Sequence, residues 1–244
     1  MSSSDNLKVG FIKGGQLGKM LLEAAPTFNI RTLVMDSDPQ CPCHNLCHEF
    51  VLGDEQSFDD VYAFGKKLDV LTFEYEHINV DALKKLQAEG LKVYPDPSIL
   101  EIVQDKGRQK EFYKFRGIPT AEFRLISGRK ELQACAGFLP AVQKTRKAGY
   151  DGKGIYKITT AQDMVAAFDE PSVLEKFIDF DKEIAVIAAR NPEGKTVVYP
   201  TVEMLFHPTR WRNYVNVQAR NKECLYYVVQ VFLLFRIIIG ILIH

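Results

Sequence analysis

The segment from Lys144 to Gly154, KTRKAGYDGKG, carries the residue types best suited to binding a polyphosphate. It contains three glycines and four cations. Glycines let a loop move and let its backbone approach an anion closely, while Lys and Arg supply positive charge for phosphate oxygens. Turn chemistry alone does not explain an aspartate and a tyrosine among the glycines. We interpret the segment as a loop that closes over a phosphorylated ligand and excludes water; a plain basic hairpin is the alternative.

Two segments near the N-terminus could also contact a ligand. The turn Lys13–Gly18 (KGGQLG) lies between an expected strand and an expected helix, where backbone N–H groups can bind an anion. A full dinucleotide fingerprint has a glycine at the position of Lys13, so a generic tight turn is equally compatible. Thr72–His77 (TFEYEH) follows a strand at the end where open α/β sheets bind ligands. A solvated strand end is the alternative.

Two further segments contain charged residues that could either bind a ligand or be ordinary surface residues. Gln104–Lys106 opens a charged helix, and Lys106 could be an ordinary solvated lysine. Glu175–Ile178 (EKFI), followed by Glu183, could offer the backbone of a strand edge to an adenine ring and carboxylates to its amine or to ribose hydroxyls. An ordinary charged strand is equally compatible.

The elements that must position these residues form two kinds of pattern. The first hundred residues alternate strand-like and helical runs, which is typical of βαβ units around a parallel sheet. We expect strands at Leu7–Ile12, Arg31–Met35 and Val70–Phe73, and helices at Gly18–Ala25, Phe58–Lys67 and Val80–Glu89. The closely spaced prolines 95 and 97 indicate a domain boundary.

The second half has shorter strands and reads as α+β. We expect helices at Ser98–Lys114 and Ala161–Phe168, and strands at Ala141–Lys144, Ile155–Ile158, Val173–Phe177, Glu183–Ala189 and Val197–Leu205. The predicted organisation is a parallel-sheet domain at residues 1–97, a second α+β domain at 98–207 and an aberrant hydrophobic tail at 208–244.

The composition excludes some classes of function. The formal net charge is zero, which argues against a nucleic-acid-binding protein, because that work needs a basic surface. The start lacks a cationic segment followed by a long apolar run, and the five cysteines do not form a disulfide framework. We therefore expect a cytoplasmic protein with small-molecule or protein partners.

A group of potential metal ligands follows the second expected strand. It comprises Cys41, Cys43, His44, Cys47 and His48. Structural zinc sites normally have a second, distant pair of ligands, which this group lacks. The segment is therefore predicted to be a loop, with zinc binding as the alternative.

The C-terminal stretch Leu225–Ile243 is long enough to span a bilayer but contains Gln230 and Arg236. An arginine at that depth is costly unless it is paired. Because the composition turns abruptly aliphatic and aromatic without caps or turn residues, we favour a shifted reading frame or truncation after about Pro208. A membrane anchor and a buried element are the alternatives.

Taken in order, the segments KGGQLGKM, TFEYEHI, QDK, KTRKAGYDGKG and EKFIDFDKE resemble the 5-(carboxyamino)imidazole ribonucleotide synthases of the ATP-grasp superfamily. The resemblance extends from about Leu7 to His207. It implies an α/β fold in which a Rossmann-like pre-ATP-grasp domain is followed by an α+β ATP-grasp domain, incomplete here. Two departures from the family pattern are Lys13 in place of a glycine and Ala148 in place of the glycine that many relatives have.

The resemblance also implies roles for individual residues. Lys106 and Lys144 would hold ATP phosphates, with the Gly149–Ile155 loop closing over them. The adenosine contacts would come from Glu175, the segment Lys176–Ile178, Glu183 and His207. Aminoimidazole ribonucleotide would be contacted by Tyr150, Asp151 and Lys153, with Gln16, Leu17 and Glu74 lining its pocket. The phosphate-loop residues implied are Gly149, Gly152, Gly154 and Ile155; the residues nearest the chemistry are Asp151, Tyr150 and Lys153.

The implied reaction is an ATP-dependent carboxylation in purine biosynthesis. ATP would convert bicarbonate to carboxyphosphate, which delivers carbon dioxide to the exocyclic amine, with Asp151 as the base or orienting carboxylate and Mg²⁺ beside the lysines neutralising phosphoryl charge. The family's acidic magnesium ligands lie downstream of Pro208, so the metal ligands are unknown and we expect this chain to be inactive or impaired. A homodimer is possible on the same resemblance.

Three other readings remain open. The chain could be another ATP-grasp carboxylase or ligase, such as a formate-dependent transformylase or the carboxylase subunit of a biotin enzyme. It could be a nucleotide-binding remnant without turnover. It could also be membrane-tethered, if the tail is genuine.

Overall fold

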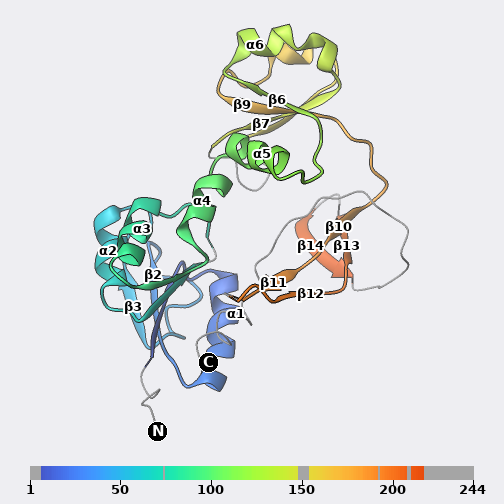
Figure 1. The fold of residues 1–244 in the computed structure, drawn as a ribbon. Helices are drawn as coiled ribbons and strands as arrows, with labels where there is room; N and C mark the ends of the chain where they lie inside the picture. The colour runs from blue at the N-terminus through green and yellow to red at the C-terminus, as the bar shows by residue number, and fades with distance from the viewer. Residues whose placement is uncertain (1–6, 74, 148–153, 192, 208–209, 217–244) are drawn as a thin grey trace. The chain divides into compact units, whose positions relative to one another are not determined.

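A computed structural model of the chain describes residues 7–73, 75–147, 154–191, 193–207 and 210–216 (Figure 1). The described residues divide into two compact units between Gln104 and Asp105. This division falls later in the chain than residue 97, where the sequence led us to expect a boundary. Each unit has its own apolar core; the first contains one sheet and the second contains three among the described residues.

The first unit is built on a five-stranded parallel sheet in the order β3-β2-β1-β4-β5. This confirms the predicted parallel sheet. Its two edge strands were not predicted, because they are short and β5 runs directly into the prolines read as a boundary. The strands are β1 (Lys8–Ile12), β2 (Arg31–Asp36), β3 (Glu49–Leu52), β4 (Val70–Phe73) and β5 (Lys92–Tyr94).

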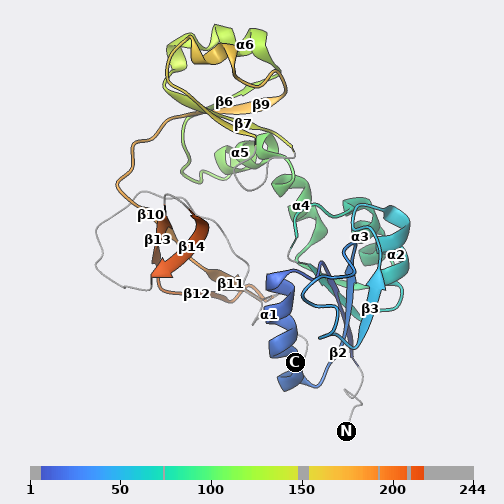
Figure 2. The same cartoon turned by 180° about the vertical axis from the view of Figure 1, so that it is seen from behind.

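Helices cover both faces of this sheet, with α1 on one face and α2 and α3 on the other (Figures 1 and 2). Ser57 and Asn79 cap α2 and α3 by accepting backbone N–H groups of the first turn. The buried side chains of α2 and α3 pack against strand residues such as Leu33 and Leu71. The helices are α1 (Gln16–Ala24), followed by a 3-10 turn (Ala25–Phe28), then α2 (Phe58–Gly65), α3 (Val80–Ala88) and α4 (Pro97–Val103).

The second unit contains a four-stranded antiparallel sheet in the order β6-β9-β7-β8. Figure 1 shows α6 on one face of this sheet and α5 on the other. Its strands are β6 (Phe123–Ile126), β7 (Ala141–Thr145), β8 (Ile155–Ile158) and β9 (Ser172–Lys176), and its helices are α5 (Lys106–Phe115), α6 (Arg129–Ala134) and the 3-10 turn Ala136–Phe138. Leu132, Phe138 and Leu174 are central to its core.

The helix predicted from Ser98 to Lys114 is two helices, so that prediction was wrong. The break comes at Asp105, whose backbone is extended and whose side chain accepts the N–H groups of Gly107 and Arg108. An aspartate in this geometry begins a new helix instead of continuing the old one. The helix predicted at Ala161–Phe168 is also wrong: a 3-10 turn at Asp163–Val165 replaces it, because Asp163 instead binds the N–H groups of the preceding residues.

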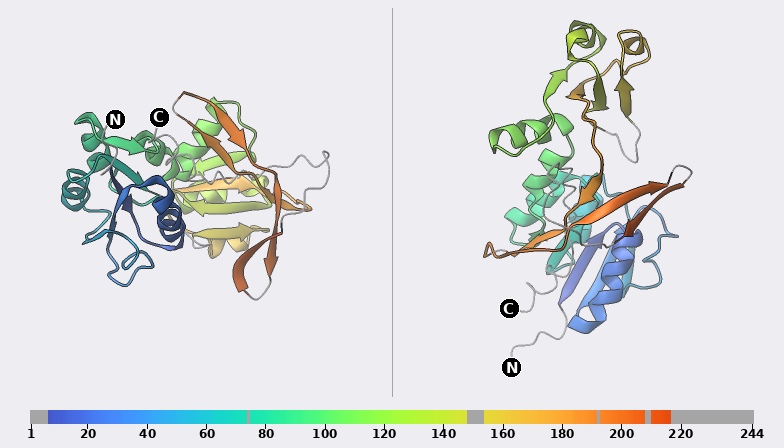
Figure 3. Two further views of the ribbon diagram at one scale, coloured as in Figure 1. Left: turned by 90° about the horizontal axis from the view of Figure 1, so that it is seen from below. Right: turned by 90° about the vertical axis from the view of Figure 1, so that its right-hand side faces the viewer.

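The two long strands predicted between residues 183 and 205 are each divided in two. Pro200 interrupts the second, since proline cannot donate to a sheet ladder, and each half pairs with a different partner. The strands β10 (Glu183–Ala185), β13 (Val202–His207) and β14 (Arg210–Asn216) form one sheet, and β11 (Ala188–Arg190) pairs with β12 (Thr196–Val198). Figure 3 shows β13 and β14 side by side as a hairpin.

Most of the predicted aberrant tail, including Leu225–Ile243, lies outside the described residues. Within the ranges that the structure does describe, no helix is both long and apolar enough to cross a bilayer.

Candidate functional site

The carboxyl ends of β1, β2 and β4 meet at one edge of the parallel sheet. Ile12 and Phe73 are register partners at the ends of β1 and β4, so the turn after β1 and the segment after β4 begin side by side. The strand order reverses direction between β1 and β4, which is where open α/β sheets bind ligands. Gln16 and Leu17, at the start of α1 after this turn, are exposed. The position of Glu74 lies outside the described residues.

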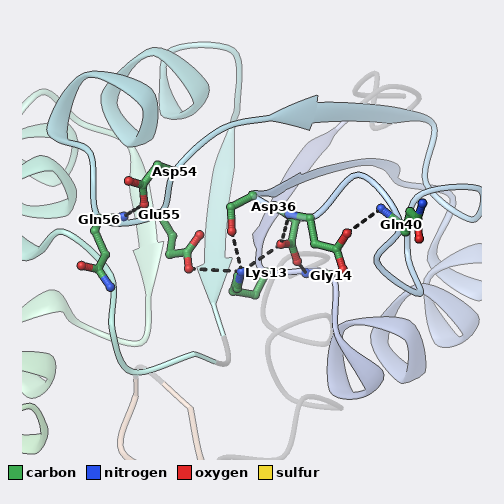
Figure 4. A network of polar contacts seen from close by, with 9 residues as sticks. Lys13, Gly14, Asp36, Gln40, Asp54, Glu55 and Gln56 are labelled. Carbon is green, nitrogen blue, oxygen red and sulfur yellow. Dashed lines mark hydrogen bonds and ion pairs between the residues drawn. The ribbon is translucent and has the colours of Figure 1, made fainter. Parts of the chain in front are cut away.

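A network centred on Lys13 organises this edge (Figure 4). Lys13 Nζ lies 2.8 Å from Asp36 Oδ1 and 3.1 Å from Glu55 Oε1. The other oxygen of Asp36 accepts the N–H of Gly14 at 2.7 Å. Both carboxylates are buried, so this lysine supplies the charge that makes their burial tolerable.

Lys13 occupies a backbone conformation that favours glycine. Its φ is 76°, a left-handed value that costs a non-glycine residue about 1 kcal/mol. The contacts of its side chain with Asp36 and Glu55 offset that cost. The glycine-like geometry of the turn is therefore kept although the glycine is absent.

The position of Asp36 also bears on which ligands this unit can bind. An acidic residue after the second strand accepts the ribose hydroxyls of a dinucleotide in Rossmann folds. Here burial tends to raise the pKa of Asp36, but hydrogen bonds from Lys13, Asp38 N–H and Gly14 N–H hold it below its ordinary value. Since both of its oxygens already accept hydrogen bonds within the protein, the geometry does not favour dinucleotide binding.

The loop after β2 (residues 41–48), predicted as a loop with zinc binding as the alternative, contributes buried side chains to the first unit. Cys41 and Cys43 are buried, and a Cβ added to Gly14 would come within 2.6 Å of Cys41 Sγ. His48 Nδ1 contacts the hydroxyl of Thr32 at 2.9 Å. Burial raises the pKa of the Cys41 thiol, the opposite of what a metal-binding thiolate needs. Among the residues with described positions, no group of three or more His, Cys, Asp and Glu side chains could hold a metal ion.

In the second unit, two lysines converge on one carboxylate. Glu175, on β9, has its Oε2 atom 3.1 Å from Lys144 Nζ of β7 and 3.3 Å from Lys110 Nζ of α5. The three side chains are 12%, 30% and 11% exposed, respectively. Two ammonium groups facing one carboxylate leave one positive charge in excess, so the cluster suits an anionic ligand.

A second ion pair joins α5 to the end of β7. Asp105 accepts two hydrogen bonds from Arg146, at 2.8 Å from Nε and 2.7 Å from Nη2. Burial tends to raise the pKa of Asp105, but the hydrogen bonds from Arg146 and from the N–H groups of Arg108 and Gly107 outweigh it and lower the pKa. The backbone N–H of Lys106 also donates to Arg146 O at 2.9 Å. These contacts hold the first turn of α5 next to Arg146. This residue leads into the segment 147–154, which is called the glycine-containing loop below.

Gly107 permits this ion pair by lacking a side chain. A Cβ at this position would lie 2.6 Å from Arg146 Nε and 2.8 Å from its Cζ. We expect Gly107→Ala to lower the free energy of unfolding by about 1–2 kcal/mol, although alanine normally stabilises a helix. Urea denaturation measures the change. The matched control is Gly137→Ala, where no heavy atom lies within 4 Å of the added Cβ; equal effects of the two substitutions would contradict the explanation.

The ends of the glycine-containing loop are closed by β7 and β8. Ile155 is the register partner of Lys144, and the N–H of Thr145 donates to Gly154 O at 2.9 Å. Gly154 has a φ of 73°, which glycine adopts without cost. Residues 148–153 lie outside the described ranges. They include Gly149, Tyr150, Asp151, Gly152 and Lys153.

Comparison with known proteins gives the family of both units. Residues 7–104 match the ribonucleotide synthetase preATP-grasp domain, and residues 111–229 match the ATP-grasp domain. N5-carboxyaminoimidazole ribonucleotide synthase from Brucella melitensis is 36% identical over 206 residues, covering 80% of this chain and 56% of the relative. The chloroplastic phosphoribosylaminoimidazole carboxylase of Vigna aconitifolia is 35% identical over 80% of this chain and 36% of the relative.

Solved structures agree with these matches. The N5-carboxyaminoimidazole ribonucleotide synthetase of Thermotoga maritima has a TM-score of 0.74 and 38% identity, covering 81% of this chain and 53% of that one. The carboxyaminoimidazole ribonucleotide synthase of Aspergillus clavatus complexed with ATP has a TM-score of 0.76 and 31% identity, covering 83% and 55%. The chain belongs to the ATP-grasp family of N5-carboxyaminoimidazole ribonucleotide synthases. It spans between 36% and 56% of the length of these relatives.

Within this synthase family, the structure brings together some of the residues that the sequence singled out. Lys144 and Ile155 are register partners on β7 and β8, and the carboxylate of Glu175 on β9 lies 3.1 Å from Lys144 Nζ. Lys106 begins the helix packed beside Arg146. Glu183 begins β10, where burial raises the pKa of its carboxyl group. His207 ends β13. Lys144 and Glu175 are therefore in contact although 31 residues separate them in the sequence. Glu183 and His207 lie on another sheet, β10-β13-β14.

The segment predicted to receive adenine is partly committed to internal contacts. Lys176 Nζ donates to the carbonyl oxygens of Phe138 and Leu139, both at 3.1 Å, and its N–H donates to Glu122 O. The N–H of Phe177 donates to Pro140 O at 3.0 Å, and Lys157 Nζ lies 3.8 Å from the centre of the Phe177 ring. Ile178, the next residue, is 45% exposed.

Three residues of the site in this synthase family member received no individual role from the sequence, although Asp105 and Arg146 lie in segments that the sequence singled out. Asp105 and Arg146 form the ion pair at the loop, and Lys110 shares Glu175 with Lys144. The spacing gave a usable signal for Lys110, because it follows Lys106 by four residues and so lies on the same helix face. The pairing of Asp105 with Arg146 spans 41 residues and has no local signal.

Proposed function

We propose that the chain is the nucleotide-binding part of an ATP-dependent ligase that carboxylates 5-aminoimidazole ribonucleotide with bicarbonate. The products are N5-carboxyaminoimidazole ribonucleotide, ADP and phosphate. The observation that carries this proposal is the excess positive charge of Lys110 and Lys144 around Glu175, at the base of the glycine-containing loop. Two Aspergillus clavatus structures support it: one was solved with ATP, and one with ADP and 5-aminoimidazole ribonucleotide.

Each residue of the proposed nucleotide site has a role that follows from its chemistry. Lys144 and Lys106 bind the phosphates as cations. Glu175 accepts a hydrogen bond from the exocyclic amine of adenine, and Glu183 accepts from the ribose hydroxyls. His207 is assigned to nucleotide binding without a more specific role. Because the side chain and the N–H of Lys176 are engaged within the unit, its contact with adenine falls to its carbonyl oxygen, and Phe177 and Ile178 complete the adenine-binding edge.

The family resemblance assigns further residues to the aminoimidazole ribonucleotide. Tyr150, Asp151 and Lys153 act nearest the reacting amine, where Asp151 orients it or removes its proton. Gly149, Gly152 and Gly154 allow the loop to fold over the phosphates, and Ile155 anchors its far end. Gln16, Leu17 and Glu74 are the further residues that the resemblance assigns to this substrate.

The same proposal includes magnesium, a cytoplasmic location and a possible homodimer. Bound magnesium would neutralise phosphate charge during transfer. The described part of the chain does not contain a matching site, because no three His, Cys, Asp or Glu side chains in it are grouped so that they could hold a metal ion. The proposal therefore assigns magnesium no ligand and no step here.

The experiment is a thermal-shift titration of the whole 244-residue chain, followed by an ADP-release assay. We expect ATP and 5-aminoimidazole ribonucleotide each to stabilise the protein, by about 2.7 kcal/mol at roughly 100 times the Kd, and GTP and NAD to have little effect. ADP release that requires both bicarbonate and the ribonucleotide would establish turnover. Stabilisation by ATP without the ribonucleotide would instead favour another ATP-grasp ligase or a nucleotide-binding remnant, and no response to ATP would refute the proposal.

A further inference from the structure

The Glu175 carboxylate is held by two lysines that differ in their surroundings. Lys110 is 11% exposed, and its Nζ also donates a hydrogen bond to the Thr120 hydroxyl. Lys144 is 30% exposed and stands one residue before the end of β7, next to the glycine-containing loop. Lys110 is therefore the fixed partner of Glu175, and Lys144 is the partner with access to a ligand.

We propose that Lys110 is a positioning residue that keeps the Glu175 carboxylate charged and in place while Lys144 leaves it to bind the phosphates of the nucleotide. This inference rests on the proposed function and deepens it, because it explains how one carboxylate can serve adenine while its neighbouring lysine serves the phosphates. In this arrangement Lys110 touches neither ligand.

The need for a second lysine follows from the burial of Glu175. The side chain of Glu175 is 12% exposed, and a buried carboxylate that loses its cation tends to take up a proton. A protonated carboxyl group carries an O–H donor on one oxygen, so that oxygen becomes a poorer acceptor for the adenine amine. With Lys110 retained, the departure of Lys144 leaves a neutral ion pair instead of an isolated charge.

The charges around Lys110 agree with this order of events. Burial lowers the pKa of Lys110, Glu175 raises it and Lys144 lowers it further. Tyr113, on the same helix, has its pKa raised by burial and by Glu175. Tyr113, Lys144 and Glu175 face Lys110 from α5, β7 and β9, respectively. The positive charges of Lys110 and Lys144 repel each other as long as both share the single carboxylate of Glu175. Phosphate binding by Lys144 relieves that repulsion.

The test separates adenine recognition from phosphate recognition. The whole chain and its variants Lys110→Met and Lys144→Met are titrated by calorimetry with ATP and with inorganic tripolyphosphate. We expect Lys110→Met to weaken ATP binding about tenfold and to change tripolyphosphate binding less than about twofold, whereas Lys144→Met weakens both. Equal losses for both ligands in Lys110→Met would make Lys110 a phosphate ligand and overturn the proposal, as would unchanged ATP affinity.

Two milder variants guard against misfolding. Lys110→Arg keeps a cation and is expected to recover most of the ATP affinity lost in Lys110→Met. Thr120→Val keeps the ammonium group and removes its second hydrogen bond, so a loss of about threefold or less in ATP affinity is expected. If Lys110→Arg behaves like Lys110→Met while remaining folded, the charge of Lys110 is not what matters, and the proposal fails.

A readout without nucleotide distinguishes failure of this inference from failure of the proposed function. Carbon NMR of the Glu175 carboxyl group is compared between Lys144→Met and the double variant Lys110→Met/Lys144→Met, in which the absence of Lys144 imitates its departure. We expect the carboxyl group to take up its proton at a higher pH in the double variant than in Lys144→Met, because the double variant lacks both lysines beside it. If both variants take up the proton at the same pH, the inference is overturned. If the unmodified chain fails to bind ATP, the proposed function is refuted, and this NMR comparison alone decides the role of Lys110.

Discussion

Replacing Lys144 with methionine is expected to lower the affinity of the chain for ATP about 30-fold, which corresponds to roughly 2 kcal/mol. Lys144 is the more exposed of the two lysines at Glu175 and lies on the strand that leads into the glycine-containing loop. Methionine keeps most of the length of the side chain but removes its charge. Because Lys110 still neutralises Glu175 in this variant, the second unit should remain folded, so the loss of affinity can be measured by calorimetry on a native protein.

The control for this prediction is Lys130→Met. Lys130 lies on α6 and is exposed, and it is not part of the cluster at Glu175. We expect ATP affinity to change less than about twofold in this variant, since an exposed lysine outside the site contributes little to binding. If the two variants lose affinity equally, general electrostatic attraction would account for nucleotide binding, and the site at Glu175 would be wrong.

Replacing Asp36 with alanine is expected to lower the free energy of unfolding by about 3 kcal/mol, the cost of breaking a buried ion pair. Asp36 receives Lys13 Nζ at 2.8 Å and Gly14 N–H at 2.7 Å. Without it, a partly buried ammonium group and a buried N–H each lose a partner, and Lys13 loses a contact that offsets its left-handed backbone. Urea denaturation, together with hydrogen exchange of the β1 and β2 amides, measures the effect on the first unit.

The matched control is Glu23→Ala, which also removes an acid paired with a lysine. Glu23 and Lys19 form an exposed pair on α1 with an N–O distance of 3.7 Å, so the expected loss is no more than about 0.5 kcal/mol. A comparable loss in both variants would contradict the importance that we give to burial of the Lys13 network.

The contribution of Asp36 should also depend on pH. Its pKa is lower in the folded protein than the ordinary value of 3.8, so its stabilising contribution is present above about pH 4 and is lost as the pH falls through the folded-state pKa. Asp36→Ala should therefore flatten the acid limb of the stability profile below about pH 4. An unchanged profile would show that other carboxylates determine acid unfolding of this unit.

The parallel sheet of the first unit followed directly from local sequence. Apolar runs at β1, β2 and β4 alternate with helices whose caps, Ser57 and Asn79, can be read in the sequence. The edge strands β3 and β5 could not be read in the same way, because they are short and acquire their strand conformation by pairing with β2 and β4. Local periodicity cannot report pairing with a partner that is distant in the chain.

In the second unit, local pattern was less informative. The continuous charged run from Ser98 predicts one helix. In the structure Asp105 accepts the N–H of Gly107, which makes it the cap of a new helix, and its carboxylate is also held by the distant Arg146. Likewise, the apolar run from Val197 predicts one strand, while pairing with two different strands divides it around Pro200. Competing hydrogen-bond partners decided both cases.

By itself, the sequence determined the βαβ order of the first unit, the family, and the candidate roles of Lys106, Lys144 and Glu175. These depend on residue type and local spacing, which the chain carries without folding. The tertiary structure alone decided that Lys110 and Lys144 share one buried carboxylate and that Lys13 joins Asp36 to Glu55. Such charge clusters arise when the sheet brings residues from separate elements within about 3 Å of each other, and burial then makes each charge depend on its neighbours.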